Sequence, residues 1–180
     1  MKMYGACLHH DGGGVGAAVP LGVWEYRFSK LKEAGINAIR TAHNPMAPEF
    51  YDLCDRMGML VMNENFDTWE YRKNPYDYHL YFNDWWEKDL TAMIKRDRNH
   101  PSVVLYSVGN EIRDNLNNED GFRKYKMQQD LIHVLDPTRP VTMALFRPNV
   151  SGVYNNGFAD RMDIVGQNYR PAELLAAHAQ

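Results

Sequence analysis

The sequence of 180 residues has few cysteines, no long apolar run and no excess of positive charge. Its two cysteines, Cys7 and Cys54, lie far apart and form no CxxC or Cys/His cluster, which argues against a zinc site and favours two buried free thiols. No apolar stretch reaches the ~18 residues of a membrane span, and the N-terminus lacks the charged-then-apolar pattern of a signal peptide. We therefore expect a soluble protein without a membrane partner, which is cytoplasmic if Met1 is its native start.

The charge balance also argues against a nucleic-acid partner. The formal net charge is -3 and the pI is about 6.1, and no basic stripe interrupts the sequence. The hydrophobic fraction of 44% and the charged fraction of 24% are those of an ordinary globular protein. Aromatic residues make up 12%, which fits both a packed core and a sugar-stacking site. No linker or low-complexity tract divides the chain, so we treat residues 1–180 as one unit.

Strand and helix patterns alternate along the chain. Helix signals include Pro48 at a first-turn position and glycines at two helix ends, Gly35 and Gly58. We expect helices at residues 24–34, 48–58, 84–97 and 122–135 and strands at residues 4–8, 36–40, 59–62, 103–108, 141–144 and 163–167. Strands separated by helices form parallel sheets. The long polar loop at residues 65–81 exceeds the usual length of such a connection, which favours a functional role.

Polar side chains follow nearly every one of these strands. They are His9, residues 40–43, Glu64, Asn110 with Glu111, and Asn168 with Tyr169. In an open doubly wound sheet such residues gather at one switch point, whereas contributions from every strand are typical of a barrel. The sequence therefore predicts an α/β fold of the (β/α)8 TIM-barrel type, incomplete, with about six βα units.

Glu111 is the main catalytic candidate. The apolar run at residues 103–108 reads as a strand buried on both faces, and it leads directly into Gly109, Asn110 and Glu111. The C-terminal end of such a strand is where ligands bind in α/β folds, so we expect Glu111 to act as a general acid/base beside Asn110. No convincing second catalytic carboxylate is found among the 180 residues.

Several motifs resemble the catalytic TIM barrel of family 2 glycoside hydrolases, which includes β-galactosidases, β-glucuronidases and β-mannosidases. They are residues 40–45 (Arg-Thr-Ala-His-Asn-Pro), 97–102 (Asp-Arg-Asn-His-Pro-Ser) and 107–111 (Ser-Val-Gly-Asn-Glu). Residues 8–11 (Leu-His-His-Asp) and 76–79 (Tyr-Asp-Tyr-His) look most like the bacterial β-galactosidase branch. The resemblance implies a partial barrel domain over residues 1–180 and a β-linked oligosaccharide or galactoside as substrate.

The resemblance also implies roles for individual residues. Glu111 would protonate the glycosidic oxygen and later activate water, while Asn110 would hydrogen-bond the sugar 2-hydroxyl. Arg40 would lie beneath the nucleophile and hold it ionised. His43 and His9 would line the sugar subsite, and Tyr169 would lie beside the nucleophile.

The chain departs from the family pattern in three ways. The family's nucleophilic Glu belongs after a seventh strand, which this chain does not contain, and the two β-sandwich domains that precede the barrel are absent. Some family members bind magnesium through an acid and a His in the third-strand loop. Here Asp67 could supply the acid, but Trp69 stands where the His would be, so we expect neither a metal nor another cofactor. We expect the chain alone to be weakly active or inactive.

Other interpretations remain open at this stage. Glu64 could replace the missing nucleophile, although the resemblance makes it a support residue of the site floor. Trp69 is a candidate for sugar stacking, whereas the pair at residues 85–86 is expected in the core. His9, His10 and Asp11 suggest a metal-dependent hydrolase, but adjacent histidines on a strand point to opposite faces. A non-catalytic carbohydrate-binding or self-associating half-barrel is the alternative function, because the unpaired first and sixth strands favour homo-oligomers.

Overall fold

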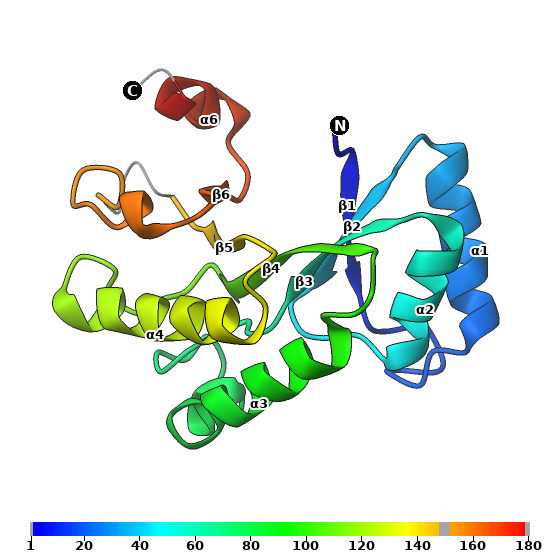
Figure 1. The fold of residues 1–180 in the computed structure, drawn as a ribbon, viewed down its shortest axis with the longest axis horizontal. Helices are drawn as coiled ribbons and strands as arrows, with labels where there is room; N and C mark the ends of the chain where they lie inside the picture. Colours follow the sequence, from blue (N-terminus) through cyan, green and yellow to red (C-terminus); the bar gives the residue numbers. More distant parts are fainter. Residues whose placement is uncertain (1, 148–151, 179–180) are drawn as a thin grey trace.

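The sheet of the protein contains six parallel strands in the order in which they occur in the sequence. The fold is taken from a computed structural model, which describes residues 2–147 and 152–178. The sheet curls into part of a barrel, and its two edges are the first and the last strand (Figure 1). The strands are β1 (Gly5–His9), β2 (Ala38–Ala42), β3 (Leu60–Glu64), β4 (Val103–Asn110), β5 (Val141–Leu145) and β6 (Gly166–Gln167).

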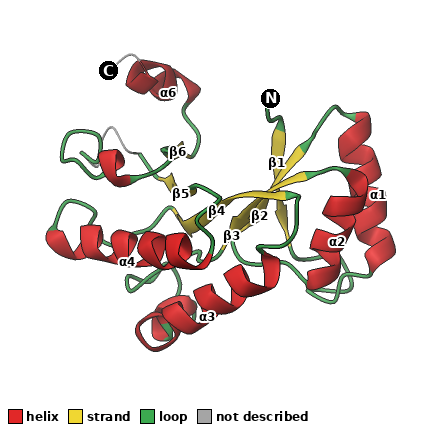
Figure 2. Ribbon diagram, viewed as in Figure 1, coloured by secondary structure: helices red, strands yellow, loops and turns green. Residues whose placement is uncertain are grey.

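The connecting helices lie outside the curled sheet (Figure 2). They are α1 (Leu21–Glu33), α2 (Pro48–Met57), α3 (Phe82–Asp97) and α4 (Glu119–Leu135), with short 3-10 helices η1 (Tyr78–Leu80) and η2 (Ala159–Arg161). A further helix, α6 (Pro171–His178), follows β6. Every described connection between neighbouring strands returns the chain to the same end of the sheet, as parallel pairing requires. The architecture is an incomplete (β/α)8 barrel, as predicted.

The main hydrophobic core lies between the sheet and its helices. Ile39, Val61 and Val108 are buried there against aromatic residues of the helices, such as Phe28 and Phe50. Successive side chains of a strand point to opposite faces, so Arg40 and its neighbours on the other strands point into the barrel. The outward face carries most of the apolar core together with a few buried polar contacts to the helices, such as Asn63 with Asp97, while the candidate site lies on the inward face and the strand ends.

Local sequence signals fix most helix ends. Pro48 begins α2, and Gly58 ends it with φ of 66°, a left-handed conformation that glycine adopts without strain. The α4 helix begins at Glu119 and not near residue 122 as expected. Asn118 is its N-cap, and the Asn118 side chain accepts a hydrogen bond from the backbone N–H of Gly121 at 2.9 Å.

The β2 and β6 strands start two and three residues later than predicted, because side chains bond to backbone groups beside them. The β2 strand starts at Ala38 and not at residue 36, since the Asn37 side chain accepts a hydrogen bond from the Tyr4 backbone and donates one to the Lys2 carbonyl. The β6 strand contains only Gly166 and Gln167, whereas residues 163–167 were expected. The Asp163 carboxylate accepts a hydrogen bond from the backbone N–H of Val141, so that it caps β5 and does not extend β6.

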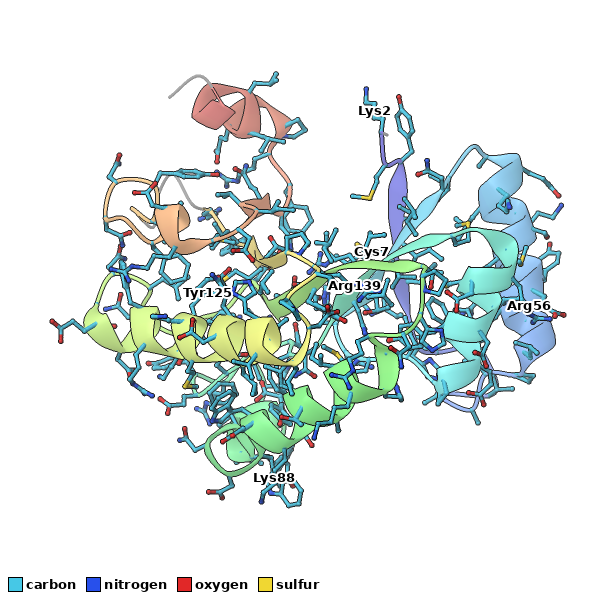
Figure 3. All side chains as sticks on the ribbon, viewed as in Figure 1. Lys2, Cys7, Arg56, Lys88, Tyr125 and Arg139 are labelled. Carbon is cyan, nitrogen blue, oxygen red and sulfur yellow. The ribbon has the colours of Figure 1, made fainter. Side chains whose placement is uncertain are left out.

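Both cysteines are free, but only Cys54 is buried. The expectation for Cys7 was wrong, because this residue lies on β1 at the edge of the sheet and its side chain is exposed (Figure 3). Burial raises the pKa of the Cys54 thiol, which keeps it protonated and unreactive. Trp85 also differs from the prediction of a core position, since it is 47% exposed. Within the described part of the chain, no helix is long and apolar enough to cross a membrane.

Candidate active site

Glu64 is the centre of a buried polar cluster at the C-terminal ends of β2, β3 and β4. Arg40 donates two hydrogen bonds to it, from Nε to Oε2 at 2.8 Å and from Nη2 to Oε1 at 2.9 Å. Ser107 donates to Oε2 at 2.6 Å, and His43 Nδ1 lies 2.7 Å from Oε1. The Glu64 side chain is 0% exposed. Because both oxygens are engaged and no surface is open to a substrate, this geometry suits a supporting role and not a nucleophile.

Arg40 connects this cluster to Asn110. Arg40 Nη2 donates to Asn110 Oδ1 at 2.8 Å, and Arg40 Nη1 donates to Asn168 Oδ1 at 3.2 Å. Arg40 lies in the middle of β2, where the prediction had placed it at the end of that strand. Its long side chain reaches along the inner face to the strand ends. Within the part of the chain that the structure describes, the carboxylate partner of Arg40 is Glu64.

Asn110, the last residue of β4, is fixed by three neighbours. Its Oδ1 accepts hydrogen bonds from Arg40 and from Asn168, the latter at 3.0 Å, and its Nδ2 donates to Asp67 Oδ1 at 2.9 Å. The orientation of the amide is therefore determined by charged groups on two sides. Such a pre-oriented amide suits recognition of a substrate hydroxyl, and this role stays a prediction.

Glu111 follows directly, with a backbone conformation that is uncommon for a residue with a side chain. Its φ is 45°, and its backbone N–H donates to the Ala144 carbonyl of β5 at 2.8 Å. Glu111 Oε1 accepts a hydrogen bond from Asn168 Nδ2 at 2.9 Å. The charge of Glu111 and a hydrogen bond to it raise the pKa of the exposed Tyr169 hydroxyl. The structure thus brings Tyr169, which the sequence had placed at another strand end, next to Asn110 and Glu111.

Lys73 is a site residue that the sequence reasoning missed. Its Nζ lies 2.7 Å from Asp67 Oδ1 and 2.6 Å from the backbone oxygen of Asn110. Burial by itself would raise the pKa of Asp67, but hydrogen bonds from Lys73 and Asn110 outweigh it and hold that pKa below its ordinary value. The only signal in the sequence was the unusual length of the loop that carries Lys73.

Trp69 does not offer a ring to a sugar, so the stacking prediction is not supported by its position. The side chain is fully buried, its ring lies 6.2 Å from that of Phe82, and Nε1 donates to the Val108 carbonyl at 2.8 Å. A Cβ on Gly109 would lie 3.3 Å from Trp69 Nε1 and only 2.7 Å from a side-chain atom of Ile112. Glycine therefore lets the end of β4 pack closely against these side chains.

Magnesium does not fit beside Asp67. The carboxylate that faces this position is occupied by an ammonium group, and the Trp69 indole N–H is a donor that cannot bind a cation. Among residues 2–147 and 152–178, no three His, Cys, Asp or Glu side chains come together as a metal site.

His9, the last residue of β1, and His10, which follows it, contact different parts of the protein, as expected for adjacent residues. The exposed His9 ring lies 5.3 Å from the His43 ring, at the strand ends. His10 instead lies 3.2 Å from Met46 Sδ and 5.6 Å from the Trp24 ring, within the packing of the helices. His9 is therefore the histidine available to a ligand.

A pocket of about 490 Å³ opens beside these residues. Its walls include His43 and Asp67 of the site together with the apolar side chains of Phe66, Tyr78 and Met93. Pockets with mostly apolar walls and a few polar groups are typical of small-molecule sites. The polar cluster thus adjoins a space that can hold part of a ligand.

The fold agrees with comparisons to known proteins. The family model described as "Glycosyl hydrolases family 2, TIM barrel domain" matches residues 2–169. The chain belongs to glycoside hydrolase family 2. This membership confirms the resemblance of the motifs and the incomplete barrel.

Named relatives in the family include galactosidases and glucuronidases. The chain is 39% identical to the beta-galactosidase BoGH2A of Bacteroides ovatus over 96% of its own length, and 39% identical to a putative beta-glucuronidase of Formosa agariphila over 99%. It spans only 24% and 17% of those proteins.

Solved structures show the same fold. A beta-glycosidase from Bacteroides vulgatus matches with a TM-score of 0.83 and 43% identity, over 99% of this chain and 22% of that one. A GH2 beta-galacturonidase from Eisenbergiella tayi bound to galacturonate matches with a TM-score of 0.81 and 28% identity, over 97% of this chain and 31% of that one.

Proposed function

We propose that this domain forms part of the active site of a retaining β-glycosidase, with Glu111 as the acid/base. The observation that carries the proposal is the half-buried Glu111 carboxylate at the end of β4, next to the oriented amide of Asn110. Family membership supports it, because retaining glycosidases use one carboxyl group to protonate the leaving group and a second as nucleophile. Glu111 would protonate the glycosidic oxygen and then, as a carboxylate, take a proton from the water that opens the glycosyl-enzyme.

The sugar would lie against the strand ends on the inner side of Glu111. Asn110 would bind its 2-hydroxyl, and His43, His9, Arg40 and Tyr169 would line the subsite. The support is that these side chains come from β1, β2, β4 and the segment after β6 and meet in one place. Trp69 is not part of this proposal because it is buried.

The nucleophile is the missing half of the reaction. Among the described carboxylates near Glu111, Glu64 is enclosed by Arg40 and His43, and Asp67 is bound to Lys73. We therefore propose that a protein of these 180 residues hydrolyses glycosides weakly or not at all. Loss of one member of a two-residue mechanism lowers rates by orders of magnitude.

We infer a galactoside-like substrate from the motifs at residues 8–11 and 76–79 and from the name of the Bacteroides ovatus relative. The Formosa agariphila relative is named a putative beta-glucuronidase, so a uronic acid is the competing substrate. Hydrolysis of 4-nitrophenyl β-galactoside, β-glucuronide and β-mannoside tests the order of preference. The 180-residue chain is expected to show little turnover, and strong turnover that Glu111→Gln abolishes would contradict its inactivity.

The acid/base role of Glu111 is tested in an active protein that contains this domain, by comparing how Glu111→Gln changes kcat/KM for substrates with poor and with good leaving groups. Protonation matters for a poor leaving group but hardly for an activated one, so Glu111→Gln should lower kcat/KM for methyl β-galactoside about 10²-fold more than for the 2,4-dinitrophenyl glycoside. Glu49→Gln, an exposed carboxylate in the first turn of α2, is the matched control and should change neither. Equal losses on both substrates would contradict the assignment.

A further inference from the structure

The loop between β3 and α3 is built to present one lysine to the end of β4. Within this loop, Asp77 Oδ2 accepts hydrogen bonds from the backbone N–H groups of Lys73 and Asn74, at 2.7 and 2.6 Å. Asp77 Oδ1 accepts from the backbone N–H of His79. One carboxylate therefore closes a tight turn and fixes the backbone from which the Lys73 side chain extends.

The Lys73 ammonium bridges two oxygen atoms. One is Asp67 Oδ1 at 2.7 Å and the other is the backbone oxygen of Asn110 at 2.6 Å. Hydrogen bonds from a charged donor are stronger than those between neutral groups, so the ammonium holds both acceptors in place. The Lys73 side chain is only 13% exposed, so water screens this charge weakly.

Asp67 connects Lys73 to the Asn110 side chain through hydrogen bonds. Its Oδ1 accepts from Lys73 and also from Asn110 Nδ2 at 2.9 Å. Lys73 therefore holds Asn110 at two points, directly through its backbone oxygen and indirectly through Asp67. The next residue in the chain is Glu111, with its uncommon φ of 45°.

We propose that Lys73 is a positioning residue for Asn110 and Glu111, a fixed internal cation that orients the acid/base strand end for glycosyl transfer. The proposal rests on the proposed role of Glu111. A lysine on an ordered loop supplies the positive charge without a binding step, and its tether fixes where the charge lies. Because the Lys73 ammonium already occupies the Asp67 carboxylate, Asp67 is not available to bind a divalent ion.

The first test measures the contact itself and needs no enzyme activity. In Lys73→Met, the pKa of Asp67 followed by carboxyl ¹³C NMR should rise by about one unit or more, because an adjacent cation lowers a carboxyl pKa by about that amount. The Asn110 side-chain amide signals should shift together with it. The other charged groups facing this pair are His43 and Arg40, which remain in the variant.

Two further variants control this titration. Lys73→Arg keeps a cation and should leave the pKa of Asp67 low, while Lys95→Met removes an exposed lysine of α3 and should change nothing. If Lys73→Met does not fold by circular dichroism, Lys73→Gln is titrated in its place. An unchanged Asp67 pKa in the folded uncharged variant would overturn the proposal.

The second test separates positioning from simple structural support. In an active protein containing this domain, Lys73→Met should lower kcat about 10²-fold, the typical cost of misplaced reacting groups, with a much smaller change in KM. Lys73→Arg should restore part of kcat. Unchanged kcat would overturn the positioning role. Unchanged activity of Glu111→Gln in the same active protein would instead refute the proposed function, while the NMR titration would still decide whether Lys73 holds Asp67 and Asn110.

Discussion

At the scale of single residues, the site depends on charges that are buried only because they are paired. Glu64 is fully enclosed, and Arg40 is only 14% exposed. Removing one partner of such a pair leaves the other charge buried without compensation, which costs more than the pair itself contributes. The residues that shape the sugar subsite should therefore also be among those that stabilise the fold.

Glu64→Gln should lower the free energy of unfolding by about 3 kcal/mol, because the Arg40 guanidinium loses its buried carboxylate partner. Urea denaturation measures this change. Glu33→Gln is the matched control, since Glu33 forms an exposed ion pair with Lys30 on α1 and such pairs contribute about 0.5 kcal/mol or less. If Glu64→Gln and Glu33→Gln lower the free energy of unfolding equally, burial does not determine how much the Glu64 cluster contributes to stability.

At the scale of elements, buried ion pairs attach the loops to the barrel. Lys124 of α4 is buried, and its Nζ lies 2.8 Å from Asp114 and 2.7 Å from Asp120, with Glu70 as a third partner. Asp114 also accepts a hydrogen bond from the backbone N–H of Tyr71 at 3.0 Å. This lysine therefore joins α4 to the long loop after β3 and to the loop after β4, which carry the site.

Lys124→Met should destabilise the protein by about 3 kcal/mol, since three carboxylates lose their shared cation. Lys126→Met, two residues along the same helix, removes an exposed lysine paired with Asp130 and should cost about 0.5 kcal/mol or less. Thermal unfolding of both variants measures the difference. A loss in Lys124→Met no larger than in Lys126→Met would contradict the anchoring role.

Asp136 attaches the C-terminal end of α4 to the sheet and makes stability depend on pH. Burial would raise the pKa of Asp136, but hydrogen bonds from Thr138, Arg139 and Tyr106 lower it to about 2 from 3.8. A lowered folded-state pKa stabilises the protein above about pH 3.8, and this contribution disappears as the pH falls toward 2. The free energy of unfolding should therefore fall over this range, and the fall should be smaller in Asp136→Asn when both are measured by urea denaturation.

At the scale of the whole molecule, the sheet is open. In the described part of the chain, β1 pairs only with β2 and β6 only with β5, so each leaves one row of backbone groups without a strand partner. The two edge strands, β1 and β6, bound the opening of the sheet (Figure 1), and the exposed Cys7 lies on β1. Exposed edges recruit further chains.

We predict that the 180-residue chain self-associates through the β1 and β6 edges. Sedimentation velocity over a range of protein concentrations should show dimers or larger species whose fraction rises with concentration. Reversible mass action is the expected behaviour because edge pairing is non-covalent. A monodisperse monomer at every concentration would contradict this prediction and would weaken the half-barrel alternative.

The sequence by itself determined the order and type of the six strands and of α1 to α4, whereas α6 was not predicted. The spacing of apolar residues and the positions of proline and glycine are local properties, so the alternation of strands and helices and the Pro48 start and Gly58 end of α2 were predictable from short windows. The incomplete barrel followed from the polar residues after nearly every strand and from the family resemblance. The apolar run before Gly109 and the Asn-Glu pair after it identified the end of β4. The same windows placed some ends wrongly, as at β2 and β6, because the side chains of Asn37 and Asp163 bond to backbone groups of segments distant in sequence.

Only the tertiary structure decided which polar groups meet. Lys73 sits in a loop with no pattern around it, and its contact with Asp67 and Asn110 depends on how that loop folds back over β4. Trp69 and Cys7 reversed their expected exposure, because burial depends on neighbours from other elements and on where the sheet ends. The spacing of residues in the sequence determines which side chains share a face of a strand or helix. Which side chains touch, which charges pair and which residues are exposed depend on how the elements pack in three dimensions.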